Sequence, residues 1–291
     1  MKQGIYQTND PYLQVTSYEL PLAGLKQGVT LLKISDLHLM IAEENSTEAQ
    51  KQHVEKQIRA WEPVRVDFAR LYGDAYDPPH LLPTGEGLAH YVELIRTLRP
   101  DAVLFSGDML EDFSEENLRF FASALEQIHV PWMWVRGNHE QGHDEAYAPY
   151  MQDGKPAQTL SVGSSRFKLI GLDNASKRVT AEQTAAALSE ASEEGCVPVL
   201  AMHIPALTAY NREECACFNP YFLLGTGEVD GDTAAFLAQL QREDDPFHFA
   251  AILCGHVHGR HVSSYRPGHL QICTSSAMVG ACSLFRFVPK A

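Results

Sequence analysis

The chain has 291 residues, of which 45% are hydrophobic and 21% charged, so it can bury a sizeable core and is not an intrinsically disordered protein. Its 37 acidic and 23 basic side chains give a formal net charge of -14, which disfavours general nucleic-acid binding or attachment to an anionic membrane. No apolar run approaches the roughly 18 residues of a spanning helix, and the first residues lack the apolar core of a signal peptide, so we expect a cytoplasmic protein.

The six cysteines follow no spacing typical of a disulfide scaffold, and we expect them to be reduced. Cys215 and Cys217 are close enough in sequence to share a soft metal ion. No second pair of Cys or His lies at a zinc-finger interval from them, so a plain loop is the favoured interpretation.

Strand-like and helix-like segments alternate along most of the chain. Near-continuous apolar runs, typical of strands buried on both faces, cover residues 29–34, 102–105, 131–135, 167–170, 197–202 and 250–254. Helical spacing of apolar residues covers residues 87–98, 114–128, 180–193 and 232–241. This alternation predicts an α/β sheet fold.

The last part of the chain departs from this rhythm. After His258 only short strand-like pieces remain, at 271–274 and 283–288, and they predict a closing antiparallel portion. Neither an internal repeat nor an interdomain linker is visible in the sequence. We therefore expect a single domain over residues 1–291.

Residues 40–86 have the features of a helical insertion. The Asn-Ser-Thr-Glu sequence at 45–48 can cap a helix, which Pro63 is expected to end before a second short helix begins. The apolar residues of these two helices are Val54, Ile58 and Trp61 before the proline, and Val64, Phe68 and Leu71 after it. The insertion begins directly after His38, so two roles stay open: it restricts access to a site, or it is a decoration packed elsewhere.

Five polar motifs each follow a predicted strand, which is where open α/β sheets place their sites. They are Asp36-Leu37-His38, Gly107-Asp108, Gly137-Asn138-His139-Glu140, His203 and Gly255-His256-Val257-His258. The i, i+2 spacing in the first and last motifs projects both polar side chains to one side of an extended backbone. One such motif alone is more often a capped turn, and a lone histidine is more often a core residue. Five of them after separate apolar runs predict one composite site.

The order D-x-H, G-D, G-N-H-E, H, G-H-x-H resembles that of the calcineurin-like metallophosphoesterase superfamily, from Asp36 to His258. The resemblance implies a four-layer α/β/β/α sandwich of two mixed sheets with a dinuclear metal centre. The implied ligands are Asp36, His38 and His258 for one metal, Asn138, His203 and His256 for the other, and Asp108 as a bridge between both. It also implies that His139 lies beside the metals as an acid or a phosphate-stabilising group.

The chemistry of these side chains agrees with that implication. Imidazole nitrogen and carboxylate oxygen suit Mn²⁺, Fe and Zn²⁺ better than Mg²⁺ or Ca²⁺, so we expect two divalent or trivalent transition-metal ions. A bridging carboxylate such as Asp108 can hold two cations at the ~3.5–4 Å separation of two-metal hydrolases.

These features predict phosphoester hydrolysis by a metal-bound hydroxide, because metal binding lowers the pKa of water towards ~7. His139 is the predicted catalytic residue, as proton donor to the leaving oxygen or as a stabiliser of phosphoryl charge. Glu140 stands where the family usually has Asp, and its side chain is one methylene longer. Either it orients His139 without binding a metal itself, or it is a plain surface or helix-start acid.

The loop at 204–231, which follows His203, is the expected substrate side of the site. Its aromatic residues can stack a nucleobase or simply pack the loop, and its arginine can pair with a second phosphate. These residues are Tyr210, Phe218, Tyr221, Phe222 and Arg212, and Arg260 and His261 are further candidates for substrate contact.

The leading functional interpretation is hydrolysis of a small soluble phosphomonoester or phosphodiester. A nuclease of the same superfamily is an alternative, against which the acidic composition counts. A non-catalytic binding scaffold is another, against which the presence of every predicted ligand counts. We expect a small-molecule partner, and neither nucleic acid nor a membrane.

Overall fold

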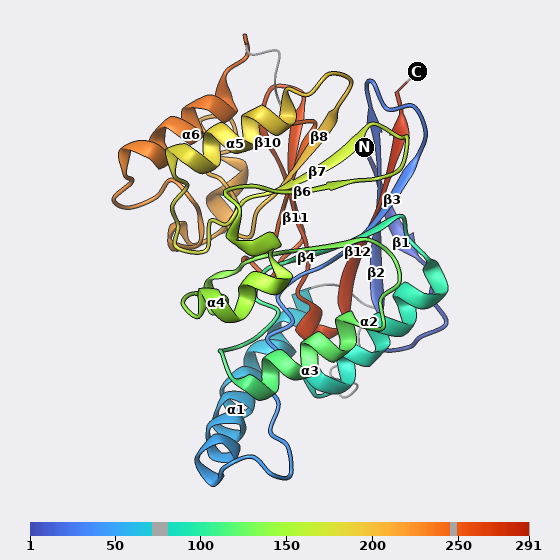
Figure 1. Ribbon diagram of the computed structural model, residues 1–291, viewed down its shortest axis with the longest axis vertical. Coiled ribbons are helices and arrows are strands. Elements are labelled where there is room, and N and C mark those ends of the chain that lie inside the picture. The colour runs from blue at the N-terminus through green and yellow to red at the C-terminus, as the bar shows by residue number, and fades with distance from the viewer. Residues whose placement is uncertain (72–80, 245–248, 291) are drawn as a thin grey trace.

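The computed structural model describes residues 1–71, 81–244 and 249–290, and it contains two mixed six-stranded sheets (Figure 1). The first sheet has the order β1 (Lys2–Tyr6), β2 (Gln14–Leu22), β12 (Ala281–Pro289), β3 (Val29–Ile34), β4 (Ala102–Ser106) and β5 (Trp132–Val135). The second has the order β10 (His261–Arg266), β11 (His269–Cys273), β9 (Ala251–Cys254), β8 (Val197–Ala201), β7 (Phe167–Gly171) and β6 (Gln158–Ser161). Parallel strands occupy the middle of each sheet.

Helices cover the outer faces of the two sheets (Figure 1). The helices are α1 (Glu48–Leu71), α2 (Thr84–Leu98), α3 (Glu115–Leu125), α4 (Asp144–Tyr147), α5 (Ala181–Ala191) and α6 (Gly231–Gln241). The first sheet packs against α2 and α3, the second against α5 and α6, and a third apolar cluster fills the space between the sheets. The predicted four-layer α/β/β/α sandwich is therefore confirmed.

Successive side chains along each central strand point alternately into two apolar layers, which explains why these strands are continuously apolar in sequence. In β3, Leu31 faces the space between the sheets and Leu32 faces the helices; in β8, Val199 and Leu200 divide in the same way. A strand buried on both faces has no polar side, so it is recognisable from composition alone. All six predicted internal strands are present, within one or two residues at their ends.

The edges of the sheets differ from the sequence-based expectation. Strands β1, β2, β6 and β10 were not predicted, although Tyr18, Leu20 and Leu22 alternate with less buried residues along β2. The closing portion is only partly antiparallel: β12 runs antiparallel to β3 and parallel to β2, while β11 runs antiparallel to β10 and parallel to β9. Pairing partners of this kind are selected by tertiary packing, which short apolar runs do not specify.

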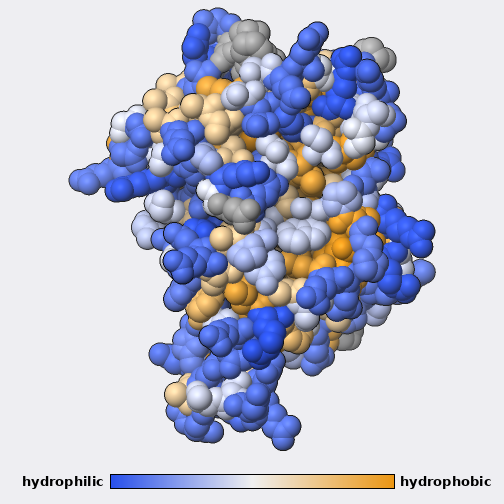
Figure 2. Space-filling view, in the orientation of Figure 1, coloured by the Kyte–Doolittle hydropathy of each residue, from blue (hydrophilic) through white to orange (hydrophobic). Residues whose placement is uncertain are grey.

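The predicted break in the insertion is wrong, because α1 continues through Pro63 as one helix of 24 residues. A proline inside a helix removes one backbone hydrogen bond, and here its side of the helix is exposed, so water can satisfy the carbonyl that is left. The helix is anchored just beyond the proline, where the buried Arg65 donates hydrogen bonds to the carbonyl oxygens of Met278 and Leu82. Figure 2 shows mainly hydrophilic residues on the projecting end of α1.

Lys33 of β3 is wholly buried, and its ammonium donates a hydrogen bond of 2.5 Å to Thr274 Oγ1. Burial lowers the pKa of Lys33 to about 8, from 10.5, while the nearby Asp36 carboxylate opposes this shift. Between these two values the unfolded chain binds more protons than the folded one, so the free energy of unfolding rises with pH.

We expect that rise to contribute about 3 kcal/mol between pH 8 and 10.5, with the full penalty of the buried charge present below pH 8. Urea unfolding of the wild type and of Lys33→Met across this range isolates it, because only the wild type has the titrating ammonium. Lys26→Met, at an exposed position, serves as the matched control. If the difference in free energy of unfolding between the wild type and Lys33→Met does not change with pH, Lys33 does not have a lowered pKa in the folded protein.

Candidate metal centre

The five predicted motifs meet where the carboxyl ends of the central strands of both sheets converge. Asp36 and His38 follow β3, Asp108 follows β4, His203 follows β8, and His256 and His258 follow β9. Residues Asn138–Glu140 form the short 3-10 helix η2 directly after β5. Parallel strands that end at one edge bring their following loops together, and here the two sheets contribute to one site.

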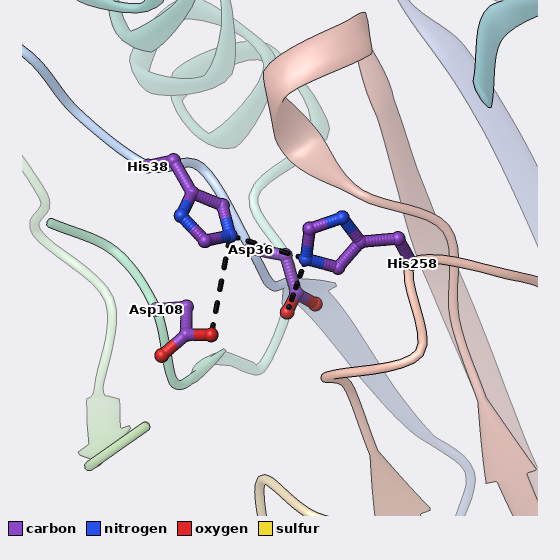
Figure 3. Close-up of side chains that lie close together, drawn as sticks. All are labelled: Asp36, His38, Asp108 and His258. Carbon is purple, nitrogen blue, oxygen red and sulfur yellow. Dashed lines mark hydrogen bonds and ion pairs between the residues drawn. The ribbon is translucent and has the colours of Figure 1, made fainter. Parts of the chain in front are cut away.

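One group of ligand atoms is formed by Asp36, His38, Asp108 and His258, whose donor atoms all lie within 4.8 Å of one another. His258 Nε2 lies 3.3 Å from Asp36 Oδ1 and 3.1 Å from His38 Nε2. His38 Nε2 lies 3.9 Å from Asp108 Oδ2. Figure 3 shows these four side chains pointing toward one another, with Asp36 and His38 on one loop and Asp108 and His258 on two other segments.

A second group shares Asp108 with the first and adds His203 and His256. His203 Nε2 lies 3.0 Å from Asp108 Oδ2 and 3.2 Å from Asn138 Oδ1. The rings of His203 and His256 are 5.0 Å apart. Asp108 is thus common to both groups, which is the position a bridging carboxylate must occupy.

The buried donors fit metal binding because the second ring nitrogen of two histidines is already occupied. His203 Nδ1 donates to the carbonyl oxygen of Ser106 at 2.8 Å, which leaves Nε2 facing Asp108 as the ring atom that can bind a cation. His38 Nδ1 lies 2.7 Å from Glu111 Oε2, which likewise leaves Nε2 facing the site. Metal-binding histidines commonly hold this outer hydrogen bond to a carbonyl or a carboxylate. These clusters are consistent with a dinuclear metal site.

The electrostatics of the site favour anionic carboxylates. Burial opposes their ionisation, but His258 and His203 hold the pKa of Asp36 below its usual range, and His203 and His38 do the same for Asp108. Burial also opposes charging of His203, yet Asp108 and Asp36 raise its pKa to about 9. Burial and the neighbouring His203 lower the pKa of His256 to about 3. Cations entering the site would meet two carboxylates that are already ionised.

The backbone is left-handed at five of the seven proposed ligands, which corrects the expectation of extended i, i+2 pairs. The φ angles are 58° at Asp36, 49° at His38, 52° at Asp108, 68° at His256 and 51° at His258. Residues with side chains adopt this region at a cost, and such strain gathers at functional sites. Interloop hydrogen bonds hold the conformation, among them Asp36 N to Gly107 O and His38 N to Asp108 O.

Two motif glycines are required by close approach rather than by a turn alone. A Cβ at Gly137 would lie 2.2 Å from Asp108 Oδ1, and a Cβ at Gly107, where φ is 90°, would lie 2.3 Å from His203 Nδ1. Both glycines therefore allow loops that follow separate strands to touch across the site.

Glu140 is fully buried, so it is not a surface acid. Its carboxylate accepts four backbone hydrogen bonds, from Gly137, Asp108, Met109 and Leu110, at 2.5–3.0 Å. Glu140 therefore holds the Asp108 loop, whereas the sequence suggested that it orients the His139 ring. Burial and the Asp108 carboxylate raise the pKa of Glu140 to about 7, although the N–H donors act in the opposite direction.

Glu111 is a site residue that sequence reasoning missed. Its carboxylate contacts His38, as described, and lies 3.4 Å from His139 Nδ1. Burial opposes its ionisation, but hydrogen bonds from His38 and from the Trp61 side chain keep the pKa of Glu111 below its usual value. The available signal was its position three residues after Asp108, in the same loop.

His139 lies beside the first group, with its ring 4.6 Å from that of His38 and 28% of its side chain exposed. Its backbone N–H donates to Asp108 Oδ1, and its Nδ1 donates to the carbonyl oxygen of Glu111 at 2.6 Å. Burial opposes its protonation, but the carboxylates of Asp108 and Glu111 raise the pKa of His139 above its usual value. Its Nε2 remains as the atom that can give or accept a proton.

The predicted substrate loop 204–231 reaches the site through one aromatic residue. The Phe222 ring lies 5.4 Å from the His256 ring, in an edge-on arrangement, and Phe222 is 41% exposed. Tyr221 is 71% exposed and receives the Lys177 ammonium over its ring, at 4.7 Å.

The structure shows other neighbours for the remaining candidates for substrate contact. Phe218 packs on His261, while Tyr210 donates a hydrogen bond to Glu243. Arg212 is exposed. Arg260 is half-buried, and its charge opposes the rise that burial causes in the pKa of Tyr18 of β2. Cys215 and Cys217, like the other four cysteines, are free thiols.

The fold and this site together define a metal-dependent phosphoester hydrolase. The family model of calcineurin-like phosphoesterases matches residues 29–260, and the chain belongs to that family. Of the helices within the described residues, none has the length and apolar character needed to cross a membrane.

Two known proteins illustrate the similarity. The chain is 24% identical over 255 residues to the 3',5'-cyclic adenosine monophosphate phosphodiesterase CpdA of Escherichia coli K12, an alignment covering 82% of this chain and 72% of that protein. A dimetal phosphatase from Danio rerio has a similar structure, with a TM-score of 0.54, 14% identity, and coverage of 86% of this chain and 88% of the other. At that identity the second likeness concerns the fold.

Proposed function

We propose that the protein hydrolyses a small phosphodiester of the cyclic nucleoside monophosphate class at a dinuclear metal centre. The observation that carries the proposal is the position of Asp108, which is common to two buried groups of His and Asp ligands. A carboxylate shared in this way suits a pair of cations that together bind one phosphoryl group.

The residues divide between two metal positions. Asp36, His38 and His258 would hold one cation, Asn138, His203 and His256 the other, and Asp108 both. This division follows the two groups of donor atoms, with Asn138 assigned by its 3.2 Å approach to His203. The mixture of nitrogen and oxygen donors favours Mn²⁺, Fe or Zn²⁺. When bound, such cations neutralise phosphoryl charge and lower the pKa of water.

The protein residues then supply orientation and a proton. Glu140 and the glycines hold the Asp108 loop, and Glu111 holds the ring of His38. Hydrolysis adds water to phosphorus and breaks one phosphorus–oxygen ester bond, and the departing oxygen needs a proton. His139 Nε2 is the proposed donor, because Nδ1 is committed to the Glu111 carbonyl oxygen.

Two observations support a nucleotide as the substrate. The Escherichia coli relative is named as a cyclic AMP phosphodiesterase. In addition, Phe222 exposes an aromatic ring beside His256, where it can stack on a base whose phosphate lies between the ligand groups. The net charge of -14 disfavours a long polyanionic substrate.

The test is hydrolysis by apo protein reloaded with Mn²⁺. Cyclic 3',5'-AMP, p-nitrophenyl phosphate, bis-p-nitrophenyl phosphate and single-stranded DNA are compared at equal phosphate concentration. We expect kcat/KM to be highest for the cyclic nucleotide and a chelator to remove the activity. Preferred cleavage of DNA would favour a nuclease, and preferred hydrolysis of the monoester would favour a phosphatase; either result contradicts the proposed substrate class.

Replacing His139 with Ala should lower kcat by roughly 10²–10⁴-fold, because the proton donor to the leaving oxygen is removed. Metal content, measured by elemental analysis, should stay at the wild-type value, since the ring is not among the proposed ligands. His129→Ala, at an exposed position after α3, is the matched control. Unchanged turnover in His139→Ala would remove this residue from the mechanism.

A further inference from the structure

Trp61, on the insertion helix α1, reaches the metal centre. Its indole lies 4.8 Å from the His38 ring and 5.9 Å from the His258 ring, between ring centroids. Its indole N–H also acts on the Glu111 carboxylate and helps to hold the pKa of Glu111 below its usual value. The sequence predicts only that Trp61 shares the apolar face of a helix with Val54 and Ile58.

The helix that carries Trp61 is fixed to the domain on both sides of this residue. Toward its start, Val54 is buried and Gln50 donates a 2.7 Å hydrogen bond to Glu116 of α3. His53 pairs with Asp112, which directly follows Glu111. One turn after Trp61, Arg65 binds the carbonyl oxygen of Met278.

The Met278 contact links the helix to the ligand loop. Met278 lies in the 3-10 helix η7 (Ala277–Val279), and its backbone N–H donates to the carbonyl oxygen of Asp36. Ser276 Oγ donates to the same oxygen at 2.7 Å. Trp61 itself packs against the apolar cluster of Met278, Val279 and Ala281. Helix α1 and the Asp36 loop are therefore held by one small structural unit.

We propose that Trp61 is a positioning residue of the metal centre, which holds the His38 and His258 rings and, through Glu111, the outer nitrogen of His38. The inference rests on the proposed assignment of these two histidines as ligands. Indole packing limits rotation of both rings. The indole N–H also acts on the Glu111 carboxylate, which meets His38 Nδ1 at 2.7 Å. Helix α1 is thus part of the active site and forms a fixed wall beside the first group of ligands.

The direct test is the affinity of the apo protein for Mn²⁺, measured by competition with a chelating dye. Trp61→Leu should weaken one of the two Mn²⁺ sites by about 10-fold or more, the range found for partners that orient ligands. Trp61→Phe, which keeps a ring and loses the N–H, should fall between Trp61→Leu and the wild type. Saturating Mn²⁺ should then restore most of the turnover of Trp61→Leu, which a general loss of structure would not allow.

Trp132→Phe is the matched control, because Trp132 is half-buried in β5 and packs on Phe105 instead of a ligand. It should bind Mn²⁺ as the wild type does. A second measurement needs no stable Leu variant: Co²⁺ should quench wild-type tryptophan fluorescence, and most of this quenching should be lost in Trp61→Phe. Mn²⁺ affinities in Trp61→Leu within 2-fold of the wild type, or equal quenching in Trp61→Phe, would overturn the inference. Mn²⁺ affinity and fluorescence quenching are both measured without substrate, so failure of the proposed substrate class does not affect these two results.

Discussion

Replacing Asp108 with Asn should lower metal-dependent turnover by at least about 10³-fold, equivalent to about 4 kcal/mol of transition-state stabilisation. The reason is geometric: Asp108 is shared by both groups of ligands, so one substitution weakens both metal positions. Asn keeps the shape of the side chain but removes the negative charge that offsets repulsion between two cations. The measurements are kcat at saturating Mn²⁺ and the bound metal per chain.

Asp101→Asn is the matched control for this prediction. Asp101 is exposed and lies just before β4, at the opposite end of the strand that Asp108 follows, so the same charge is removed far from the ligands. It should keep the wild-type turnover. An Asp108→Asn protein with turnover within 10-fold of the wild type would show that the two groups of ligands do not act as one centre.

Replacing Glu140 with Ala should lower the free energy of unfolding by at least about 3 kcal/mol. Four backbone N–H groups would lose their acceptor inside a buried site, and each unsatisfied donor carries a desolvation cost of about 1–3 kcal/mol. The Asp108 loop would also lose the contact that closes it, so Mn²⁺ affinity should fall together with stability. Urea unfolding of the apo protein measures the first effect, and chelator competition measures the second.

Glu182→Ala provides the comparison, since Glu182 is an exposed acid in the first turn of α5 and accepts no such set of bonds. Its effect on the free energy of unfolding should be under about 1 kcal/mol. Glu140→Gln keeps the size of the side chain but has one acceptor oxygen in place of two, so it should be intermediate. A loss below 1 kcal/mol in Glu140→Ala would mean that solvent or a relaxed loop replaces the carboxylate.

Much of the site could be predicted from sequence because each proposed ligand follows an apolar strand. Strands such as β4 and β8 are buried on both faces, so their ends are visible in composition, and the residue after each end is directed to the common edge. The residues that support the ligands were harder to find. Glu111 and Trp61 act through contacts across the fold, and neither has a local pattern that separates it from an ordinary acid or core residue.

The family, the central strands, the main helices and the residues of the predicted metal site can be inferred from the sequence, because these depend on short apolar runs and on residue types in a fixed order. Tertiary structure sets how the outer strands pair, that α1 continues through Pro63, and that five of the seven proposed ligands stand on left-handed backbone. It also decided that Glu140 holds the Asp108 loop instead of the His139 ring. The physical reason is that these features depend on which hydrogen-bonding groups meet after distant segments pack, and local propensity carries no information about such partners.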